Sequence, residues 1–362
     1  MTPKKARVIA FYLPQFHPIA ENDLWWGKGF TEWTNVGKAK SLYKNHYQPR
    51  VPADLGYYDL RMPEVRESQA EMAREAGIEG FMYWHYWFGN GKRLMENIFD
   101  DVLKSGKPDY PFCLGWANHS WYAKEWNSEG AKKDRLLIEQ TYPGEEDYRL
   151  HFEYALKAFL DPRYIRVNDC PIFFIYDTKT LPDEFLNLWN KWAIEEGLKG
   201  IHFVGRLQND NDIESLENVG YKAFSSERMW GVYSSSNLIK KTFFRLKNFF
   251  LKRPPFTVDY KEAYPHFTSE LDRKENFYPS IYPNWDHSPR SGNRGFIIHR
   301  STPEYFKKHV DHVLKMINNK QDENKIVMLK SWNEWAEGNY MEPDLVHGKS
   351  YIKALSDVIN NK

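Results

Sequence analysis

The chain is poor in the features that mark disulfide-stabilised and membrane-spanning proteins. It has 2 cysteines in 362 residues, Cys113 and Cys170, and both lie in or beside apolar, strand-like runs. We therefore expect two reduced, buried thiols rather than a disulfide framework. The chain also lacks an apolar run of about 18 residues, the length needed to cross a bilayer, so the sequence predicts a soluble protein.

No secretory leader is legible near the start of the sequence. The apolar stretch at residues 8–13 is short and ends in Pro14-Gln15, without a long hydrophobic region or a small-residue cleavage site. The sequence therefore predicts a cytoplasmic location.

Charge and motif content argue against nucleic-acid and metal chemistry. The net charge is +1, which gives no general attraction for polyanions, so nucleic acid is not an expected partner. His-Glu-x-x-His and Cys-x-x-Cys patterns are absent, and so is a carboxylate cluster with ligand spacing. The turn Gly-Asn-Gly-Lys at residues 89–92 lacks the spacing of a phosphate-binding loop. We expect neither a metal nor another cofactor.

Aromatic residues, by contrast, are abundant. The chain holds 14 Trp, 23 Tyr and 23 Phe, more than one core of this size needs. Some of them are therefore expected to line a binding surface.

The pattern of apolar runs predicts a single (β/α)8 TIM barrel over residues 1–362. Several strand-like runs lack polar alternation, as expected for strands buried on both faces. The eight predicted strands are residues 7–13, 80–87, 112–116, 172–177, 201–207, 221–225, 278–282 and 326–330. Amphipathic helices are predicted at residues 63–76, 94–104, 147–160, 183–196, 303–318 and 350–359. Functional residues of this fold lie at the C-terminal face, where elaborated loops are expected.

The one sizeable insertion is predicted at about residues 231–276, between the sixth and seventh strands. It contains a basic aromatic stretch, residues 238–256, which on a helix would place Ile239, Phe243, Leu246 and Phe250 on one side and lysines elsewhere. Such a helix can lie on an anionic membrane and hold the protein at the inner membrane, near lipid-linked glycans. The alternative is the sixth barrel helix with a solvated basic face.

The segment that follows the last predicted strand carries the strongest chemical signal. Residues 330–338, Lys-Ser-Trp-Asn-Glu-Trp-Ala-Glu-Gly, place Glu334 and Glu337 three positions apart, where a barrel enzyme keeps its acid and base. In a continued strand the two side chains would point to opposite faces, but the Gly-Asn that follows indicates a turn, in which both can point the same way. Trp332 and Trp335 flank the pair, and pyranose rings stack on indole faces. The alternative is a surface carboxylate beside core aromatics.

Polar and aromatic residues recur at the ends of the other predicted strands, which suits an open cleft for a ligand of several sugars. Each histidine among them could instead be a satisfied core residue, but three at equivalent strand ends favour a site. Asn333 or Arg228 could hold one glutamate ionised, while burial raises the pKa of the other. The candidate substrate-binding residues are His17, Glu32, Trp33, Trp84, His85, Trp116, Asn118, His119, Arg228, Trp285, Asp286, Asn333 and Trp335.

Three motifs, spread over nearly the whole chain, resemble the WbsX-type proteins of polysaccharide biosynthesis clusters, which are similar to glycoside hydrolase family 99. They are Ala-Phe-Tyr-Leu-Pro-Gln-Phe-His at residues 10–17, Phe-Thr-Glu-Trp-Thr-Asn-Val at residues 30–36 and Asn-Glu-Trp-Ala-Glu-Gly at residues 333–338. The resemblance implies a (β/α)8 barrel that acts on glycans. Family 99 members cleave within α-mannoside chains with retention of anomeric configuration.

The resemblance also implies roles for the two glutamates. Glu334 would act as base on the substrate's own 2-hydroxyl, which attacks the anomeric carbon to give an epoxide, and Glu337 would act as acid and then as base. The chain departs from the family at Ala336, where those enzymes commonly carry histidine. The exact substrate therefore cannot be carried over.

Three classes of function remain open. The first is a retaining, endo-type glycoside hydrolase or transglycosylase of bacterial surface polysaccharide metabolism, for which two carboxylates suffice. The second is a glycosyltransferase of O-antigen or lipopolysaccharide biosynthesis that uses an activated sugar donor, although nucleotide sugars are usually bound by doubly wound sheets. The third is a catalytically idle barrel that only binds glycan. In each case the expected partner is an oligosaccharide or polysaccharide, either soluble or lipid-linked.

Overall fold

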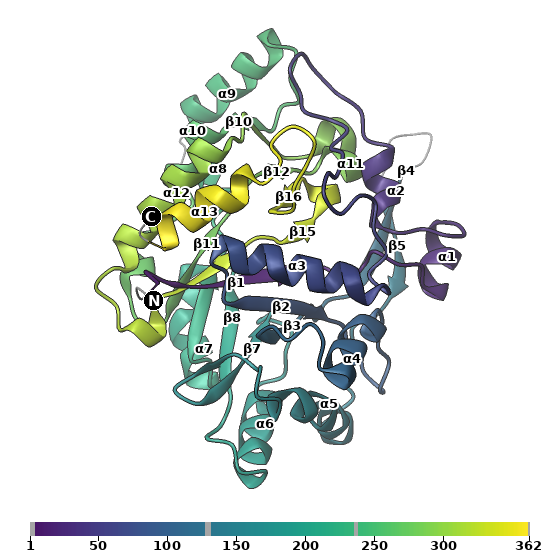
Figure 1. Cartoon of the computed structure of the whole chain (residues 1–362), viewed down its shortest axis with the longest axis vertical. Helices are drawn as coiled ribbons and strands as arrows, with labels where there is room; N and C mark the ends of the chain where they lie inside the picture. Colours follow the sequence, from purple (N-terminus) through teal and green to yellow (C-terminus); the bar gives the residue numbers. More distant parts are fainter. Residues whose placement is uncertain (1–3, 127–131, 235–237, 361–362) are drawn as a thin grey trace.

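A closed barrel of eight parallel strands forms the centre of the molecule (Figure 1). The computed structural model describes residues 4–126, 132–234 and 238–360. Around the barrel the strands follow the order β3-β2-β1-β14-β11-β9-β8-β7, and β7 pairs with β3 to close the sheet. The strands are β1 (Arg7–Tyr12), β2 (Gly80–His85), β3 (Phe112–Trp116), β7 (Cys170–Ile175), β8 (His202–Leu207), β9 (Ala223–Ser226), β11 (Phe277–Ile281) and β14 (Ile326–Leu329). Each overlaps a predicted strand, so the prediction of a (β/α)8 barrel is confirmed.

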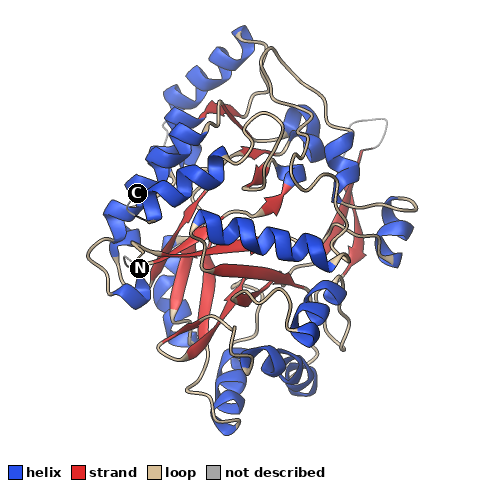
Figure 2. Ribbon diagram, in the orientation of Figure 1, coloured by secondary structure: helices blue, strands red, loops and turns tan. Residues whose placement is uncertain are grey.

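Helices separate successive strands and cover the outside of the barrel (Figure 2). The first, α3 (Pro63–Ala76), has the predicted bounds because its sequence marks both ends: Pro63 suits the first helical turn, and Gly77 takes a left-handed conformation with φ of 85°. The others are α4 (Glu96–Ser105), α5 (Glu145–Phe159), α6 (Glu184–Glu195), α7 (Ile213–Val219), α12 (Pro303–Ile317) and α13 (Ser350–Ile359).

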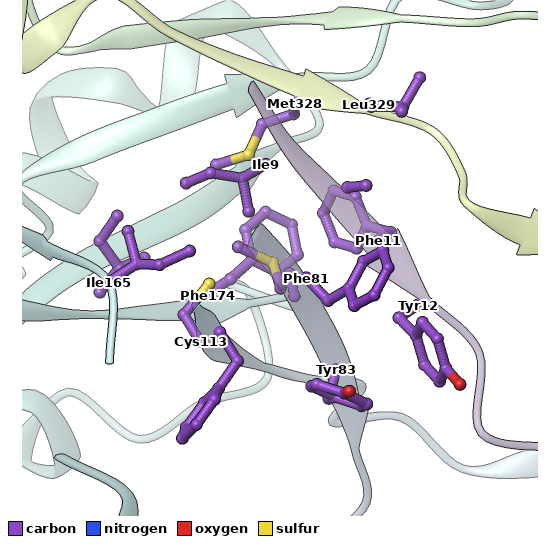
Figure 3. Packing of buried hydrophobic residues seen from close by; sticks show 14 of the residues in the cluster. Ile9, Phe11, Tyr12, Phe81, Tyr83, Cys113, Ile165, Phe174, Met328 and Leu329 are labelled. Atoms are coloured by element: carbon purple, nitrogen blue, oxygen red, sulfur yellow. The ribbon is translucent and has the colours of Figure 1, made fainter. Parts of the chain in front are cut away.

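Neighbouring residues of a barrel strand point alternately into and out of the barrel, and both directions are buried (Figure 3). On β1, Phe11 packs against Phe174 of β7 with ring centroids 5.1 Å apart. These strands are not neighbours in the sheet, so this contact crosses the barrel interior. The next residue, Tyr12, points outward and donates a hydrogen bond to Gln69 Oε1 of α3. This arrangement explains why the strands show no polar alternation in the sequence.

Between β9 and β11 the chain forms α8 (Gly231–Ser234), α9 (Leu238–Phe250), β10 (Thr257–Asp259) and α10 (Tyr260–Ala263). β10 pairs with β13 (Ile297–His299), which pairs with β12 (Trp285–Asp286), and buried side chains of this region form a second, smaller core. α9 contributes Phe244 to that core, whereas Phe243, Leu246 and Phe250 are exposed. The alternative in which this apolar side packs on the barrel as its sixth helix is therefore wrong. The side chain of Ile239 lies outside the described residues.

The remaining helices and strands are short and lie outside the eight parallel strands of the barrel. They are α1 (Ala20–Trp26), α2 (Glu32–Gly37), α11 (Ser288–Ser291), the hairpin of β4 (Trp121–Trp126) and β5 (Lys132–Ile138), β6 (Arg166–Val167), β15 (Asn333–Glu334), β16 (Asn339–Tyr340), and the 3-10 turns η1 (Asp210–Asp212), η2 (Tyr264–His266), η3 (Glu270–Arg273), η4 (Gly292–Arg294), η5 (Asp322–Asn324) and η6 (Trp335–Glu337). Both cysteines are free. In the described part of the chain, none of the helices has the length and apolarity that crossing a membrane requires.

Candidate active site

The two predicted catalytic glutamates lie in a turn beyond the last barrel strand. β14 ends at Leu329, the chain becomes briefly extended again in β15, and η6 then turns it before β16. Glu334 is the last residue of β15 and Glu337 the last of η6, so the predicted turn is confirmed. Gly338 closes the turn with φ of 54°, and a Cβ at this position would lie 2.7 Å from the Cβ of Asp286. Both the conformation and the close approach require glycine here.

Arg290 connects this turn to two other loops. Its Nη1 donates to Glu337 Oε1, and its Nη2 donates to Glu32 Oε1. Glu32 begins α2 after β1, Arg290 lies in α11 after β11, and Glu337 ends η6 after β14. Three short helices from three separate loops therefore meet at one guanidinium group. The side chains of Arg290 and Glu337 are 28% and 16% exposed, so this ion pair lies at the mouth of the barrel, whereas Glu32 is sealed beneath it at 2%.

The two glutamates have opposite charge preferences. Burial, together with the negative charge of Glu337, raises the pKa of Glu334 to about 8. Burial would also raise the pKa of Glu337, but the charge of Arg290 and the nearby His287 outweigh it and hold that pKa below its usual range. His287 Nε2 lies 3.6 Å from Glu337 Oε1. At neutral pH the site therefore holds one carboxylic acid beside one carboxylate, a division that acid–base catalysis requires.

A second set of charges lies beside the pair, over the aromatic barrel interior. Lys330, the residue after β14, is ion-paired with Glu227 after β9, and Arg206 of β8 approaches Glu227 at 3.8 Å. The ammonium group of Lys330 lies 3.6 Å from the ring centroid of Phe11 and 5.4 Å from that of Trp84. Its positive charge is felt at Glu334, where it opposes the rise in pKa. At the mouth of the barrel, positively charged and negatively charged side chains thus lie next to one another, and the aromatic rings of Phe11 and Trp84 lie below them in the barrel interior.

Several predicted binding residues belong to this mouth. Trp84 is half-buried and packs inside the barrel against Phe11. The half-buried ring of His119 lies 5.0 Å from that of Tyr176, which is itself covered by Arg206.

Two further predicted tryptophans lie on elements that reach the acidic turn. Trp33, on α2, packs with ring centroids 5.5 Å from Trp335, and Trp285, on β12, stacks near His287. Both are half-buried, so part of each indole remains accessible to a ligand.

Other predicted site residues serve the scaffold instead, because strand residues alternate in direction. His85 and Trp116 point outward: His85 Nε2 lies 2.7 Å from His151 Nε2 of α5, and Trp116 packs on the same histidine. The prediction that they bind substrate is wrong. His17 is buried, and the charge of Asp59 acts on it.

Two predicted asparagines fasten backbones together. Asn333 accepts from the Leu13 amide at 2.8 Å and donates to the Leu13 carbonyl at 3.0 Å. Asn118 does the same for Asp177, at 2.7 Å and 2.8 Å. Both are fully buried. Their amides continue strand pairing beyond the strand ends, so neither is free to bind a sugar or to hold a glutamate ionised.

The predictions for Asp286 and Trp335 are also wrong, because both side chains are buried among protein partners, whereas that for the half-buried Arg228 stays a prediction. Asp286 is buried and lies 2.7 Å from His46 Nε2, and Arg228 pairs with Asp210 at 2.6 Å. The indole of Trp335 is 1% exposed and donates to Glu342, and Trp332 is buried completely. A buried indole cannot stack on a pyranose ring, so these two tryptophans do not form the predicted sugar platform.

The residues that sequence analysis missed are those that set the charges: Arg290, His287, Lys330, Glu227 and Arg206. Lys330 had a local signal, since it directly precedes the acidic segment. Arg290 had only its place after the seventh strand, because its partner Glu32 is 258 positions away.

Comparison with known proteins identifies relatives over almost the whole chain. The family model described as glycosyltransferase WbsX matches residues 8–355. An uncharacterized protein WxcX from Xanthomonas campestris pathovar campestris is 33% identical over 98% of this chain and 50% of its own length, in each of two strains. The chain thus spans about half the length of the curated relatives it matches.

Solved structures share the fold at low sequence identity. A GH99 endo-alpha-mannosidase from Bacteroides thetaiotaomicron, in complex with Bis-Tris propane, aligns with a TM-score of 0.57 at 15% identity, covering 99% of this chain and 98% of that chain. A glycoside hydrolase-like protein aligns with a TM-score of 0.60 at 16% identity, covering 99% and 95%. These neighbours have the barrel in common with this chain.

Proposed function

Because the chain belongs to the WbsX glycosyltransferase family, we propose that it is a glycan-active enzyme in which Glu334 and Glu337 form an acid–base pair. The observation that carries the proposal is that Arg290 forms an ion pair with Glu337 and favours its ionised form, whereas burial beside that carboxylate raises the pKa of Glu334. Breaking a glycosidic bond requires one group that protonates the departing oxygen and another that stays ionised beside the anomeric centre. The raised pKa of Glu334 and the lowered pKa of Glu337 meet these two requirements.

The proposed reaction is retaining, endo-type cleavage or transfer within an oligosaccharide or polysaccharide of the bacterial surface, or a lipid-linked precursor of one. The barrel shared with an endo-alpha-mannosidase supports this class, and so does a mouth bordered by the half-buried indoles of Trp33, Trp84 and Trp285. Half-exposed aromatic faces suit several consecutive sugar rings.

We assign the proton donor to Glu334. Glu337, held ionised by Arg290, then either attacks the anomeric carbon or takes the proton of a 2-hydroxyl that attacks it. This order is the reverse of the one that the family 99 resemblance implies, in which Glu334 is the base. The family 99 order, with Glu337 as the acid, would require substrate to draw Arg290 away from Glu337.

A glycan screen tests the reaction class. The purified protein is incubated with α-linked mannosides and bacterial surface polysaccharides, while new reducing ends and their anomeric configuration are followed. Glu334→Gln and Glu337→Gln should each lower turnover at least about 100-fold. Glu270→Gln, which changes an exposed carboxylate of η3, is the matched control and should leave turnover unchanged. Full turnover in both site variants would exclude the pair as catalysts.

Leaving groups of different acidity test the assignment of roles. An aryl α-mannobioside with an acidic phenol needs little protonation, so Glu334→Gln should lose far less activity on it than on an alkyl glycoside. Glu337→Gln should lose similar activity on both. If instead the rescue is confined to Glu337→Gln, the roles follow the family 99 order.

The second candidate is glycosyl transfer from an activated donor, which the family description favours. The Asp-Asn-Asp triplet at residues 210–212, in η1, offers two carboxylates beyond β8, but Asp210 pairs with Arg228 and Asp212 with Lys179. Release of nucleoside diphosphate from a nucleotide sugar, dependent on acceptor glycan, would assign this reaction instead.

A further inference from the structure

Helix α9 turns a continuous apolar face away from the protein. Phe243, Leu246, Phe249 and Phe250 are 60%, 52%, 75% and 78% exposed, and their spacing places them on one side of a helix with 3.6 residues per turn. Leu251, directly after the helix, is also exposed. An outward helix face is normally polar, and a contiguous exposed apolar patch marks an interaction surface.

The opposite side of α9 fixes the helix to the body. Phe244 is buried in the second core, and the Asn248 amide donates to the carbonyl oxygens of Pro255 and Thr257 at 3.0 Å and 2.8 Å. Lys247 pairs with Glu262 at 2.8 Å. Because the inward side has its own apolar and polar partners, the outward phenyl groups are not needed to hold α9 against the protein.

The chain around α9 carries positive charge and no carboxylate. Residues 228–258 contain seven Lys and Arg and no Asp or Glu. Among the described residues, Lys247 and Arg253 are paired with acids of the following segment, whereas Lys241, Arg245 and Lys252 have no acidic partner. Arg245 borders the apolar face, and Lys252 follows two residues after the helix ends, whereas Lys241 falls on the opposite, inward side of the helix.

A second basic segment lies against the end of α9. Residues 33–53 also contain no Asp or Glu and include the exposed lysines 38, 40 and 44. The Arg253 guanidinium lies 5.5 Å from the ring centroid of Tyr43, and Figure 1 shows this loop reaching the end of the helix at the top of the molecule. The positive charge of α9 is thus extended along one side of the protein.

We propose that α9 is a peripheral membrane contact, in which Phe243, Leu246, Phe249 and Phe250 enter the boundary between headgroups and acyl chains of an anionic bilayer. Arg245 and Lys252 then lie at the level of the headgroup phosphates. The helix has 13 residues and is about 20 Å long, so it lies on the bilayer rather than across it. A second copy of the chain fits this face less well, because a two-fold contact would oppose two basic helices.

Vesicle sedimentation tests the proposal directly. The protein is mixed with vesicles of phosphatidylcholine alone or with about one third phosphatidylserine, and we expect at least about tenfold tighter binding to the anionic vesicles. Phe249→Asp with Phe250→Asp should lower that binding at least about tenfold. The matched control is Leu150→Asp with Ile194→Asp, two exposed apolar residues of α5 and α6, which should bind like the wild type.

Three results would overturn the proposal. They are equal binding to neutral and anionic vesicles, no binding to either, and unchanged binding of the Phe249/Phe250 variant. Light scattering without lipid measures the molar mass of the protein in solution. If the wild type is a dimer that does not bind vesicles, and the Phe249/Phe250 variant is a monomer, the face belongs to a contact with a second copy of the chain. Circular dichroism checks that each variant is folded. No residue of α9 belongs to the proposed catalytic pair, so the Phe249/Phe250 variant should keep its activity on a soluble glycan, and this result and the test of the glutamate pair stand independently.

Discussion

Replacing Arg290 by methionine should destabilise the protein through the buried carboxylate that it leaves behind. Glu32 has only 2% of its side chain exposed and is ion-paired with Arg290. Breaking a buried pair by removing one partner costs about 3–5 kcal/mol, because the remaining charge is neither hydrated nor compensated. Glu337 loses the same cation but is more accessible, so we expect most of the loss to come from Glu32.

A second substitution separates this charge effect from loss of packing. Glu32→Gln removes the orphaned charge while keeping its shape, so the Arg290→Met/Glu32→Gln double variant should regain at least about 2 kcal/mol over Arg290→Met alone. The free energy of unfolding is measured by urea denaturation at pH 7. Arg61→Met is the control, since Arg61 pairs with Asp59 at the exposed surface and such pairs contribute at most about 1 kcal/mol.

One outcome refutes this reasoning. If the double variant is no more stable than Arg290→Met, then Arg290 does not act by compensating the charge of Glu32, and the charge argument for the site fails.

The remaining predictions concern Glu334 and Asn118. The folded-state pKa of Glu334, about 8, lies above the ordinary value of 4.5, so the folded protein keeps a proton that the unfolded chain releases. The stabilisation from this proton is complete below pH 4.5 and is lost as the pH rises to 8. The melting temperature of Glu334→Gln should therefore rise relative to that of the wild type between pH 5 and pH 9. A difference in melting temperature that stays constant over this range would contradict the raised pKa. Asn118→Ala leaves the partly buried backbone amide and carbonyl of Asp177 without these partners and should cost about 1–3 kcal/mol in urea unfolding, whereas Asn211→Ala in exposed η1 should cost less than about 1 kcal/mol. Equal costs would rule out the fastening role.

The sequence was sufficient for the barrel because the determinants of each element are local. An apolar run without polar alternation indicates a strand buried on both faces, and a helix such as α3 carries its own start and stop residues. The strand order then follows from right-handed crossovers between parallel strands. The acidic turn after β14 was predictable for the same reason, since its glycine and its glutamates are within five residues of one another.

The charges and directions within the site were not predictable in this way. Trp84 and His85 are consecutive, and only the register of the barrel decides that the tryptophan faces inward and the histidine packs on α5. Asn333 has the composition of a sugar ligand, yet its hydrogen bonds go to the backbone of Leu13, 320 positions away. The pairing of Arg290 with Glu32 depends on three loops that meet only in the closed barrel.

The position of β14 in the sheet has a consequence for when the site comes into existence. This strand, the eighth of the barrel in chain order, fills the space between the first barrel strand, β1, and the seventh, β11. Until it emerges from the ribosome, both neighbours present unpaired edges, and Glu334 and Glu337, which follow it in the chain, are still inside the ribosome. The strand that closes the barrel and the two glutamates therefore leave the ribosome together, so a nascent chain with an open barrel does not yet have the candidate active site.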